Sequence, residues 1–420
     1  MNPTNVKEYD VTTQVSTLAP PGRRRGVAVS IDDIPHLDPP VAYTPVTAEG
    51  PTGLPEITLP SGHTALHVTR YDDVLKVLTD PSFGRRDTNV EGGPSFQPTT
   101  MPPDLLLNLD NPDHARMKSF VNADYSPAGV EKLKGSVRRI LDRRIALLRS
   151  EESPDLFATV LDRLPVEVNV GFLGIPESDI DYFRPSSRVV QLSHDTDIPG
   201  LLENFWLVYH YVTDLVQRKR PVEPGGLIDR FLAARDEAEP PLSDDELVAI
   251  LLGSVLGADQ NVLSVLAKAV YVLVQAPALW TLLVDEPAAA PQLVEELLRV
   301  LPLGNISTFP RIATREVQLR DSVIPEGALV YADAFAANRD PDTFPHPELI
   351  DPFRDGKRHL QFGYGMHHCM GASLARMEIT TTLVLLAEEF PTLALAVEPA
   401  AVPWDSGVLL RRPTSLPVRW

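Results

Sequence analysis

The chain has 420 residues, a formal net charge of −19 and a single cysteine, Cys369. One cysteine excludes an intramolecular disulfide and is consistent with a reducing cytosol, and the acidic balance argues against nucleic acid as a partner. Because no basic-then-apolar leader opens the chain and no run of 18 or more apolar residues occurs, we expect a cytoplasmic protein without a membrane span.

The first 40 residues hold two adjacent prolines and three consecutive arginines, Arg23 to Arg25, but no helical period. That composition is typical of a flexible arm. No linker or change of composition divides the remainder, so residues 41–420 are expected to form one large domain.

Short elements come first. The segments 56–59 and 65–69 alternate apolar and polar residues on either side of Pro60-Ser61-Gly62, which predicts a hairpin. A helix over 72–78 should stop at Asp80-Pro81.

Residues 83–104 are rich in Gly, Pro, Ser and Thr and predict a long loop, which in a compact protein is usually functional. From Pro112 onward the apolar spacing is helical, and Val137, Ile140, Leu141 and Ile145 predict one buried face. Further helices are expected at roughly 153–173, 177–194, 200–220 and 225–236.

The longest predicted helix runs from an N-cap at Ser243, where Glu246 completes a capping box, to about Gln275. Its apolar residues surround the helix instead of forming one stripe, which indicates burial. The elements together predict a mostly α protein with small β-sheets.

The cysteine lies in Phe362-Gly363-Tyr364-Gly365-Met366-His367-His368-Cys369-Met370-Gly371, directly before a helical run. Glycines let a loop fold tightly, and the start of a helix favours a thiolate over a thiol. A thiolate among N–H donors suits the ligation of haem iron where O–O cleavage is to be promoted. The alternative is a buried, inert cysteine.

This loop resembles the haem-binding loop of the cytochrome P-450 family of haem-thiolate monooxygenases. Phe362, Gly363, His367, Cys369 and Gly371 stand at matching offsets. The resemblance implies a cytochrome P-450-like single large domain around a buried haem. It further implies that Phe362 packs on the thiolate side of the haem and screens the sulfur from water.

Other segments extend the resemblance over most of the chain. Glu296-Leu297-Leu298-Arg299 resembles the Glu-x-x-Arg helix of the family, and Ala337 to Pro341 resembles the segment onto which that pair locks. The ending Leu416 to Trp420 is similar to that of soluble bacterial members. A buried, structural ion pair between Glu296 and Arg299 is implied.

The cofactor implied by the resemblance is haem b, with Cys369 as its axial thiolate and the metal ligand. His367 would donate to a haem propionate. His114 and Lys118, four residues apart on one helix face, and Arg311 match further propionate partners. Lys118 keeps the charge of the usual arginine but lacks its two-pronged geometry.

The main departure from the family lies on the long helix. Oxygen-activating members carry an acid followed by a threonine, which relay protons to dioxygen, whereas this chain has Asp259 followed by Gln260 and Asn261. An amide divides donor and acceptor between two fixed atoms, unlike a hydroxyl. Three explanations are open: an amide-ordered water, a polar group of the substrate, or coupling or desaturation in place of hydroxylation. A purely structural Gln260 beside a kink-prone Gly257 is the remaining alternative.

A small-molecule substrate is also implied by the resemblance. Its expected contacts are the 83–104 loop, residues 189–204, Val255, Ala258, residues 303–308 and residues 408–409, with Phe96, Phe205 and Trp206 available to stack on an aromatic ring.

Dioxygen would be the oxidant, and ferredoxin with ferredoxin reductase would supply electrons, because the sequence contains no flavin or iron–sulfur module. An acidic ferredoxin requires a locally basic docking face. The residues expected to form that face are Arg116, Lys118, Arg138, Arg139, Arg354, Lys357, Arg358 and His368.

These implications favour a monomeric haem-thiolate monooxygenase or oxidase that tailors a secondary metabolite such as an antibiotic. A peroxide-driven or isomerising relative is a second possibility for the enzyme class. A catalytically retired protein that binds haem or recruits substrate is a third.

Overall fold

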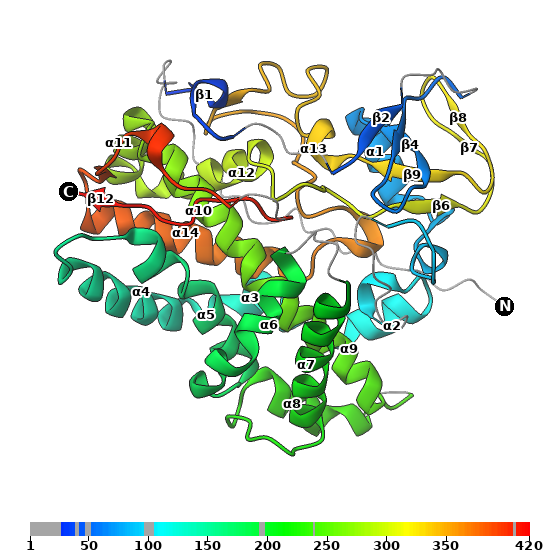
Figure 1. Cartoon of the computed structure of the whole chain (residues 1–420), viewed down its shortest axis with the longest axis horizontal. Coiled ribbons are helices and arrows are strands. Elements are labelled where there is room, and N and C mark those ends of the chain that lie inside the picture. Colours follow the sequence, from blue (N-terminus) through cyan, green and yellow to red (C-terminus); the bar gives the residue numbers. More distant parts are fainter. Residues whose placement is uncertain are drawn as a thin grey trace.

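The computed structural model describes residues 27–37, 42–46, 52–95, 105–192, 198–237, 240–405 and 409–420. Helices make up most of this body; the largest sheet lies at one side of it, and smaller two-stranded sheets lie elsewhere (Figure 1). The helices are α1 (Tyr71–Thr79), α2 (Asp113–Val121), α3 (Pro127–Glu131), α4 (Lys134–Arg149), α5 (Leu164–Leu173), α6 (Ile180–Leu192), α7 (Ile198–Val216), α8 (Leu227–Ala234), α9 (Asp244–Ala258), α10 (Gln260–Leu273), α11 (Pro277–Asp285), α12 (Ala290–Val300), α13 (Ala334–Ala337) and α14 (Ala372–Glu389). The prediction of a mostly α protein with small sheets is confirmed.

The predicted hairpin forms as β3 (Glu56–Thr58) and β4 (Thr64–Val68), with Ile57 opposite Ala65. It belongs to a six-stranded sheet in the order β2-β3-β4-β9-β6-β5, in which β4 is parallel to β9. The other strands are β1 (Val29–Ser30), β2 (Thr44–Val46), β5 (Phe83–Gly84), β6 (Arg311–Ala313), β7 (Val317–Gln318), β8 (Val323–Ile324), β9 (Leu329–Ala332), β10 (Leu349–Ile350), β11 (Ala394–Leu395) and β12 (Val418–Arg419).

The prediction of a long loop over residues 83–104 is therefore partly wrong. It opens with β5, which pairs with β6, and a short 3₁₀ turn follows at Arg86–Thr88. A two-residue strand that pairs with a segment far along the chain leaves no local periodicity. Phe96 lies outside the described residues.

The long helix begins as predicted. The Ser243 side chain accepts the Glu246 N–H, and the Glu246 carboxylate accepts the Ser243 N–H. It is not continuous, however, because Asp259 (φ −80°, ψ −76°) separates α9 from α10. The apolar pattern continues through that position, so periodicity alone does not reveal the break.

The largest cluster of buried apolar residues joins α4, α5, α7, α9, α10, α12 and α14, and a second cluster joins α1 to β4 and β9. By length and composition α9 and α10 together could cross a membrane, but most of this stretch is buried inside the protein. That burial is what a core helix of a globular protein requires.

The described part of the expected N-terminal arm docks on the body. Val29 and Ser30 pair with Ile350 and Leu349, and Ile31 is buried. Residues 1–26 and 38–41 lie outside the described residues, so the boundary predicted at residue 40 stays a prediction.

Candidate cofactor and active site

The cysteine loop folds tightly because its glycines adopt conformations that other residues avoid. Gly363 and Gly365 have φ of 66° and 68°, and a Cβ on Gly365 would lie 2.7 Å from the Leu78 carbonyl oxygen. The Cys369 N–H donates to the Phe362 carbonyl at 2.8 Å, and Gly371 caps the start of α14. The predicted position of the cysteine before a helix start is confirmed.

Cys369 is accessible to a water-sized sphere, yet burial among protein atoms raises the pKa of its thiol. Both observations place the sulfur on an internal space and not on the outer surface. The N–H groups of Gly371 and Ala372, together with Lys118, oppose that rise in the pKa. A thiolate at this position therefore needs a further positive partner, which a metal ion supplies.

Four basic side chains converge beside this loop, and the charge of Asp110 acts on three of them, Arg85, Arg311 and His114. Arg85, Arg311 and His114 are buried, and the His114 and His367 rings lie 4.6 Å apart. The Nε atoms of both arginines and the His367 Nε2 are buried without a hydrogen-bond partner. Burial and the neighbouring cations lower the pKa of His114 to about 4 and of His367 to about 2, and the pKa of Arg85 to about 9. Such a cluster is stable only when an anion joins it.

Arg85 is a site residue that the sequence reasoning missed. Its backbone N–H donates to Asp110 at 3.1 Å, while its guanidinium lies over the Phe309 ring, 4.4 Å from the centroid. No local motif marks it; the available signal is an arginine two residues after Phe83 in a loop-like segment.

Lys118 holds the loop. Its Nζ donates to the carbonyls of Met366 and His368, both at 2.8 Å. Two of its three N–H groups are thus occupied by the cysteine loop, and the predicted propionate contact has at most the third.

Phe362 is packed between the side chains of Arg376 and His359. The Arg376 guanidinium lies 4.6 Å from the centre of its ring, and the His359 ring lies 5.8 Å away. Both of those side chains bind Glu295 and lower its pKa to about 2, even though burial works against them. Phe362 is therefore fixed in orientation beside the loop, as its expected role requires.

The Glu296–Arg299 pair is buried as predicted, at 2.8 Å. Arg299 reaches the Asn338 carbonyl, which confirms one half of the expected lock. Glu296 instead accepts the Arg354 Nε at 3.0 Å and the Asp351 N–H at 3.1 Å. Arg354 is therefore only partly exposed and its guanidinium is engaged by Glu296, which does not fit its predicted place on the docking face.

Asp259 and Gln260 are buried where α9 meets α10, and only Asn261 of the three predicted catalytic residues is partly exposed. The Arg184 Nε donates to Asp259 at 2.9 Å, and the Gln260 Nε2 donates to the same carboxylate at 2.7 Å. The Asn261 amide donates to the Gly257 carbonyl at 2.9 Å.

Open space borders this helix junction. Gly253 and Gly257 are exposed although α9 is otherwise mostly buried, and a Cβ on either would have no neighbour within 4 Å. Gly371, at the other end of the site, is equally open. An open space between small residues, a cysteine and unpaired cations fits a flat, dianionic cofactor such as haem.

Several expected substrate contacts are placed differently. Val255 and Phe205 are buried in the core, whereas Trp206 is exposed, and Ala258 and Leu303 are partly exposed. Leu409 is buried, and Val408 lies outside the described residues.

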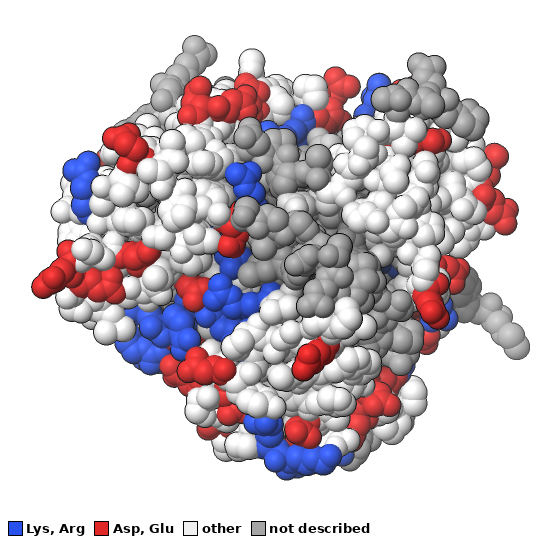
Figure 2. All heavy atoms as spheres, in the orientation of Figure 1, with Lys and Arg blue, Asp and Glu red and all other residues white. Residues whose placement is uncertain are grey.

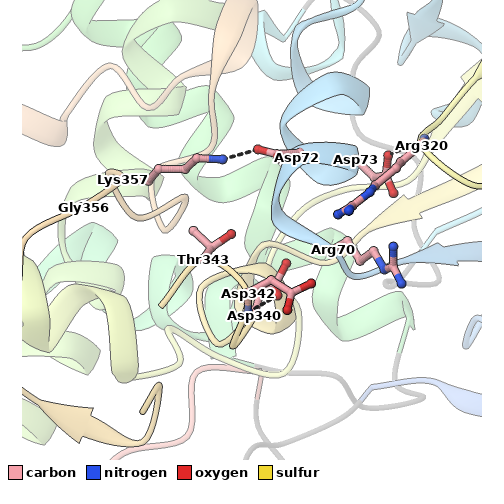
Figure 3. A pocket seen from close by; sticks show the side chains of 9 residues that line it. All are labelled: Arg70, Asp72, Asp73, Arg320, Asp340, Asp342, Thr343, Gly356 and Lys357. Carbon is pink, nitrogen blue, oxygen red and sulfur yellow. Dashed lines mark hydrogen bonds and ion pairs between the residues drawn. The ribbon is translucent and has the colours of Figure 1, made fainter. Parts of the chain in front are cut away.

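A separate surface pocket of about 230 Å³ lies beside α1 (Figure 3). Several of its lining residues are already paired: Lys357 binds Asp72, Asp340 accepts the Tyr71 N–H, and Asp73 accepts the Arg320 N–H. It contains no residue of the cysteine loop, so it is not the candidate site. Among the described residues no group of three or more His, Cys, Asp or Glu side chains is arranged to hold a metal ion.

Comparison with known proteins identifies the class. The sequence pattern described as Cytochrome P450 matches residues 290–415. The chain is 35% identical to nocardicin C N-oxygenase of Nocardia uniformis subsp. tsuyamanensis over 91% of this chain and 96% of the relative. It therefore belongs to the cytochrome P450 family and is an oxidoreductase of the monooxygenase type.

Two further relatives support this assignment. The mycinamicin IV hydroxylase/epoxidase of Micromonospora griseorubida is 35% identical over 86% of this chain and 91% of the relative. The crystal structure of cytochrome P450mel 107F1, described as having biaryl coupling reactivity, superposes with a TM-score of 0.80 at 31% identity, covering 85% of this chain and 91% of that one. The predicted family and fold are confirmed.

Proposed function

We propose that this chain is a haem-thiolate monooxygenase or oxidase that tailors a small organic secondary metabolite, with Cys369 as the axial ligand of haem b. The observation that carries the proposal is a set of buried nitrogen atoms without a hydrogen-bond partner, the Nε of Arg85 and Arg311 and the Nε2 of His367, beside an accessible Cys369. Two propionates would accept hydrogen bonds from these groups and balance the arginine charges, and the thiolate would bind the iron.

The residues divide the work of holding the cofactor. His114, His367, Arg85 and Arg311 would bind the propionates, because they lie close together and three of them have a buried nitrogen without a hydrogen-bond partner. Lys118 would keep the cysteine loop closed through its two carbonyl contacts. When bound, the haem supplies the activation of dioxygen, and electron donation from the thiolate favours O–O cleavage.

Proton supply would depend on the junction of α9 and α10. Asn261 is the partly exposed member of the Asp259–Gln260–Asn261 group and lies beside the open space at Gly257. Its amide can order a water or meet a polar group of the substrate. This arrangement supports hydroxylation with a substrate-held or amide-held water, and equally coupling or desaturation, in which the substrate contributes its own hydrogens.

The substrate class follows from the lining and from the relatives. Gly253, Gly257, Ala258 and Leu303 offer a small-residue, apolar surface of the kind that encloses organic ligands. The relatives above are named for oxidations of nocardicin C and mycinamicin IV. A microbial natural product of comparable complexity is the proposed substrate, and dioxygen the co-substrate.

Ferredoxin and its reductase are the proposed electron donors to a monomeric, cytoplasmic enzyme. On the face seen in Figure 2, acidic side chains are spread over many elements and a cluster of basic ones lies where α5 and α6 run in Figure 1. Of the basic face predicted near the cysteine loop, Arg116 pairs with Glu246, Arg138 with Asp142, and Lys357 with Asp72. Arg358 is exposed and forms no ion pair with any described residue, so we place the docking contact there.

The test is reconstitution of haem-loaded protein with ferredoxin, its reductase and NAD(P)H against a library of bacterial polyketides, peptides and polyphenols. Mass spectrometry separates the outcomes. Gain of one oxygen indicates hydroxylation, loss of two hydrogens indicates desaturation, and a dimeric product indicates coupling. Haem-loaded protein that ferredoxin reduces but that gives neither a substrate-induced spectral change nor any NAD(P)H-dependent product would contradict the proposal and favour a retired binding protein.

A further inference from the structure

Arg412 reaches Gln260 from the far end of the sequence. Its Nη2 donates to the Gln260 Oε1 at 2.7 Å, and both side chains are completely buried. A buried guanidinium is costly unless acceptors surround it. Arg412 finds the amide oxygen of Gln260, the Leu410 carbonyl at 3.4 Å and the Asp405 carboxylate at 3.9 Å.

This contact decides which way the Gln260 amide points. Arginine carries donors and no acceptor, so only the oxygen end of the amide can face Arg412. The NH₂ end then faces Asp259, and Nε2 donates to Oδ2 at 2.7 Å. A reversed amide would set N–H against N–H at one end and two oxygens against each other at the other.

Asp259 is consequently held by three N–H groups. Besides Gln260, the Arg184 Nε and Nη2 donate to it at 2.9 and 3.2 Å. Charge-assisted bonds of this kind fix both the position and the plane of a carboxylate. Gln260 has neither a rotating hydroxyl nor an exposed amide with which to relay a proton.

Arg412 is itself held rigidly. Its carbonyl accepts the Asp405 N–H at 2.9 Å, and three residues earlier the Leu409 carbonyl accepts the Asn305 N–H at 2.8 Å. A Cβ on Gly304 would lie 2.3 Å from the Leu409 carbonyl oxygen, so these segments are in close contact. Arg412 can therefore act as a fixed point from which Gln260 is oriented.

We infer that Arg412 is a positioning residue for oxygen activation, which acts through Gln260 to fix the Asp259 carboxylate. Gln260 is then a clamp between Arg412 and Asp259, and not a substitute for the hydroxyl of threonine. A threonine is too short to join both partners, which explains why this chain carries glutamine at that place. The inference rests on the proposed function.

The ratio of product formed to NAD(P)H consumed reports on this role. In hydroxylation, two electrons from NAD(P)H and two protons accompany cleavage of the O–O bond; one oxygen enters a C–H bond of the substrate and the other leaves as water. If the protons are delivered wrongly, the same two electrons and two protons leave as hydrogen peroxide with the O–O bond intact.

The experiment compares Arg412→Met, Gln260→Ala and the double variant, with Arg412→Lys as the conservative change. Lys268→Met is the control, since Lys268 is another buried basic side chain, which donates to the carbonyls of Pro302 and Leu303 without touching Gln260. The product ratio, the substrate-induced Soret change and the urea unfolding midpoint are measured for each.

Arg412→Met and Gln260→Ala should each lower the ratio by a similar factor, roughly ten- to a hundredfold for one charge-assisted bond. The double variant should fall no further, Arg412→Lys should recover part of the loss, and the substrate-induced Soret change should persist. Lys268→Met should lower the unfolding midpoint but keep the ratio. Gln260→Thr should lower the ratio as well.

Three results would overturn the inference. The first is a wild-type product ratio in Arg412→Met, and the second is a loss in the double variant equal to the product of the two single losses. The third is a raised product ratio in Gln260→Thr. Failure of the proposed function would look different: wild-type protein would lack the thiolate-type band of its reduced carbon monoxide complex, and both proposals would then fall together.

Discussion

The guanidinium of Arg299 donates two hydrogen bonds to the carboxylate of Glu296, with N–O distances of 2.8 and 2.9 Å, and Arg299 is only 1% exposed. Its other N–H groups donate to the carbonyls of Asn338, Pro347 and Leu349. One side chain thus ties α12 to the stretch of chain that leads into the cysteine loop.

Glu296→Gln should lower the free energy of unfolding by about 3–5 kcal/mol, because it leaves the Arg299 charge buried without a partner. Urea denaturation of the haem-loaded protein measures the change. Glu131→Gln is the control: its pair with Lys134, at 3.4 Å, is well exposed and should contribute very little. Equal, small effects of the two substitutions would show that the buried pair is not a structural anchor.

Glu378 on α14 predicts a pH dependence of stability. Both of its carboxylate oxygens are buried without a hydrogen-bond partner, and burial, with the charge of Asp259, raises its pKa well above the usual value. The folded protein therefore keeps this carboxyl protonated at a pH where the unfolded chain ionises it. Stability from this group is present at low pH and is lost as the pH rises above the ordinary carboxyl range.

Glu378→Gln keeps the shape and removes the ionisation. The variant should gain stability relative to wild type between about pH 5 and pH 8, as judged by urea unfolding at both values. Glu388→Gln, an exposed position on the same helix, should follow the wild-type curve. Parallel pH curves for wild type and Glu378→Gln would exclude a protonated Glu378.

Arg85 predicts the strength of cofactor retention. Arg85→Gln removes a buried cation from the proposed propionate site and should speed haem transfer to apomyoglobin by roughly ten- to a hundredfold, the effect of one charge-assisted hydrogen bond. The neighbouring Arg86→Gln is the control, because Arg86 forms an exposed pair with Asp113. Identical rates of haem transfer from both variants would show that Arg85 does not bind a propionate.

Local patterns in the sequence predicted a good part of this fold. The capping box of Ser243 and Glu246, the hairpin at Pro60-Ser61-Gly62 and the end of α1 before Pro81 each depend on a few neighbouring residues, and each is confirmed. The break at Asp259 could not be predicted, since it depends on an arginine in α6 and not on its neighbours in the chain.

The site residues divide in the same way. Cys369 was found because a long motif surrounds it, whereas Arg85 and Arg412 stand outside any motif and owe their importance to partners far along the chain. Arg354 was predicted on the docking face for the same reason, because the sequence around a charged residue gives no sign that its side chain binds the buried Glu296.

Electron transfer provides a test of the docking contact. Arg358→Glu should slow reduction by ferredoxin and flatten the dependence of its rate on salt, because one attraction across the interface becomes a repulsion. Arg218→Glu, on the connection after α7, reverses a charge on the helix layer that covers α9 and should leave the rate unchanged. Substrate affinity should be the same in all three proteins. If Arg358→Glu and Arg218→Glu slow reduction equally, only net charge matters and the docking contact lies elsewhere.

The spectrum of the reduced, carbon monoxide-bound protein tests the central claim most directly, with Cys369→Ser compared at equal haem content. Wild type should give the band characteristic of thiolate ligation, and the variant should lack it, because a serine hydroxyl is not ionised at neutral pH and donates less to the iron. No other cysteine exists to take over the position. A thiolate-type band that survives in Cys369→Ser, or that is absent from haem-loaded wild type, would contradict the account.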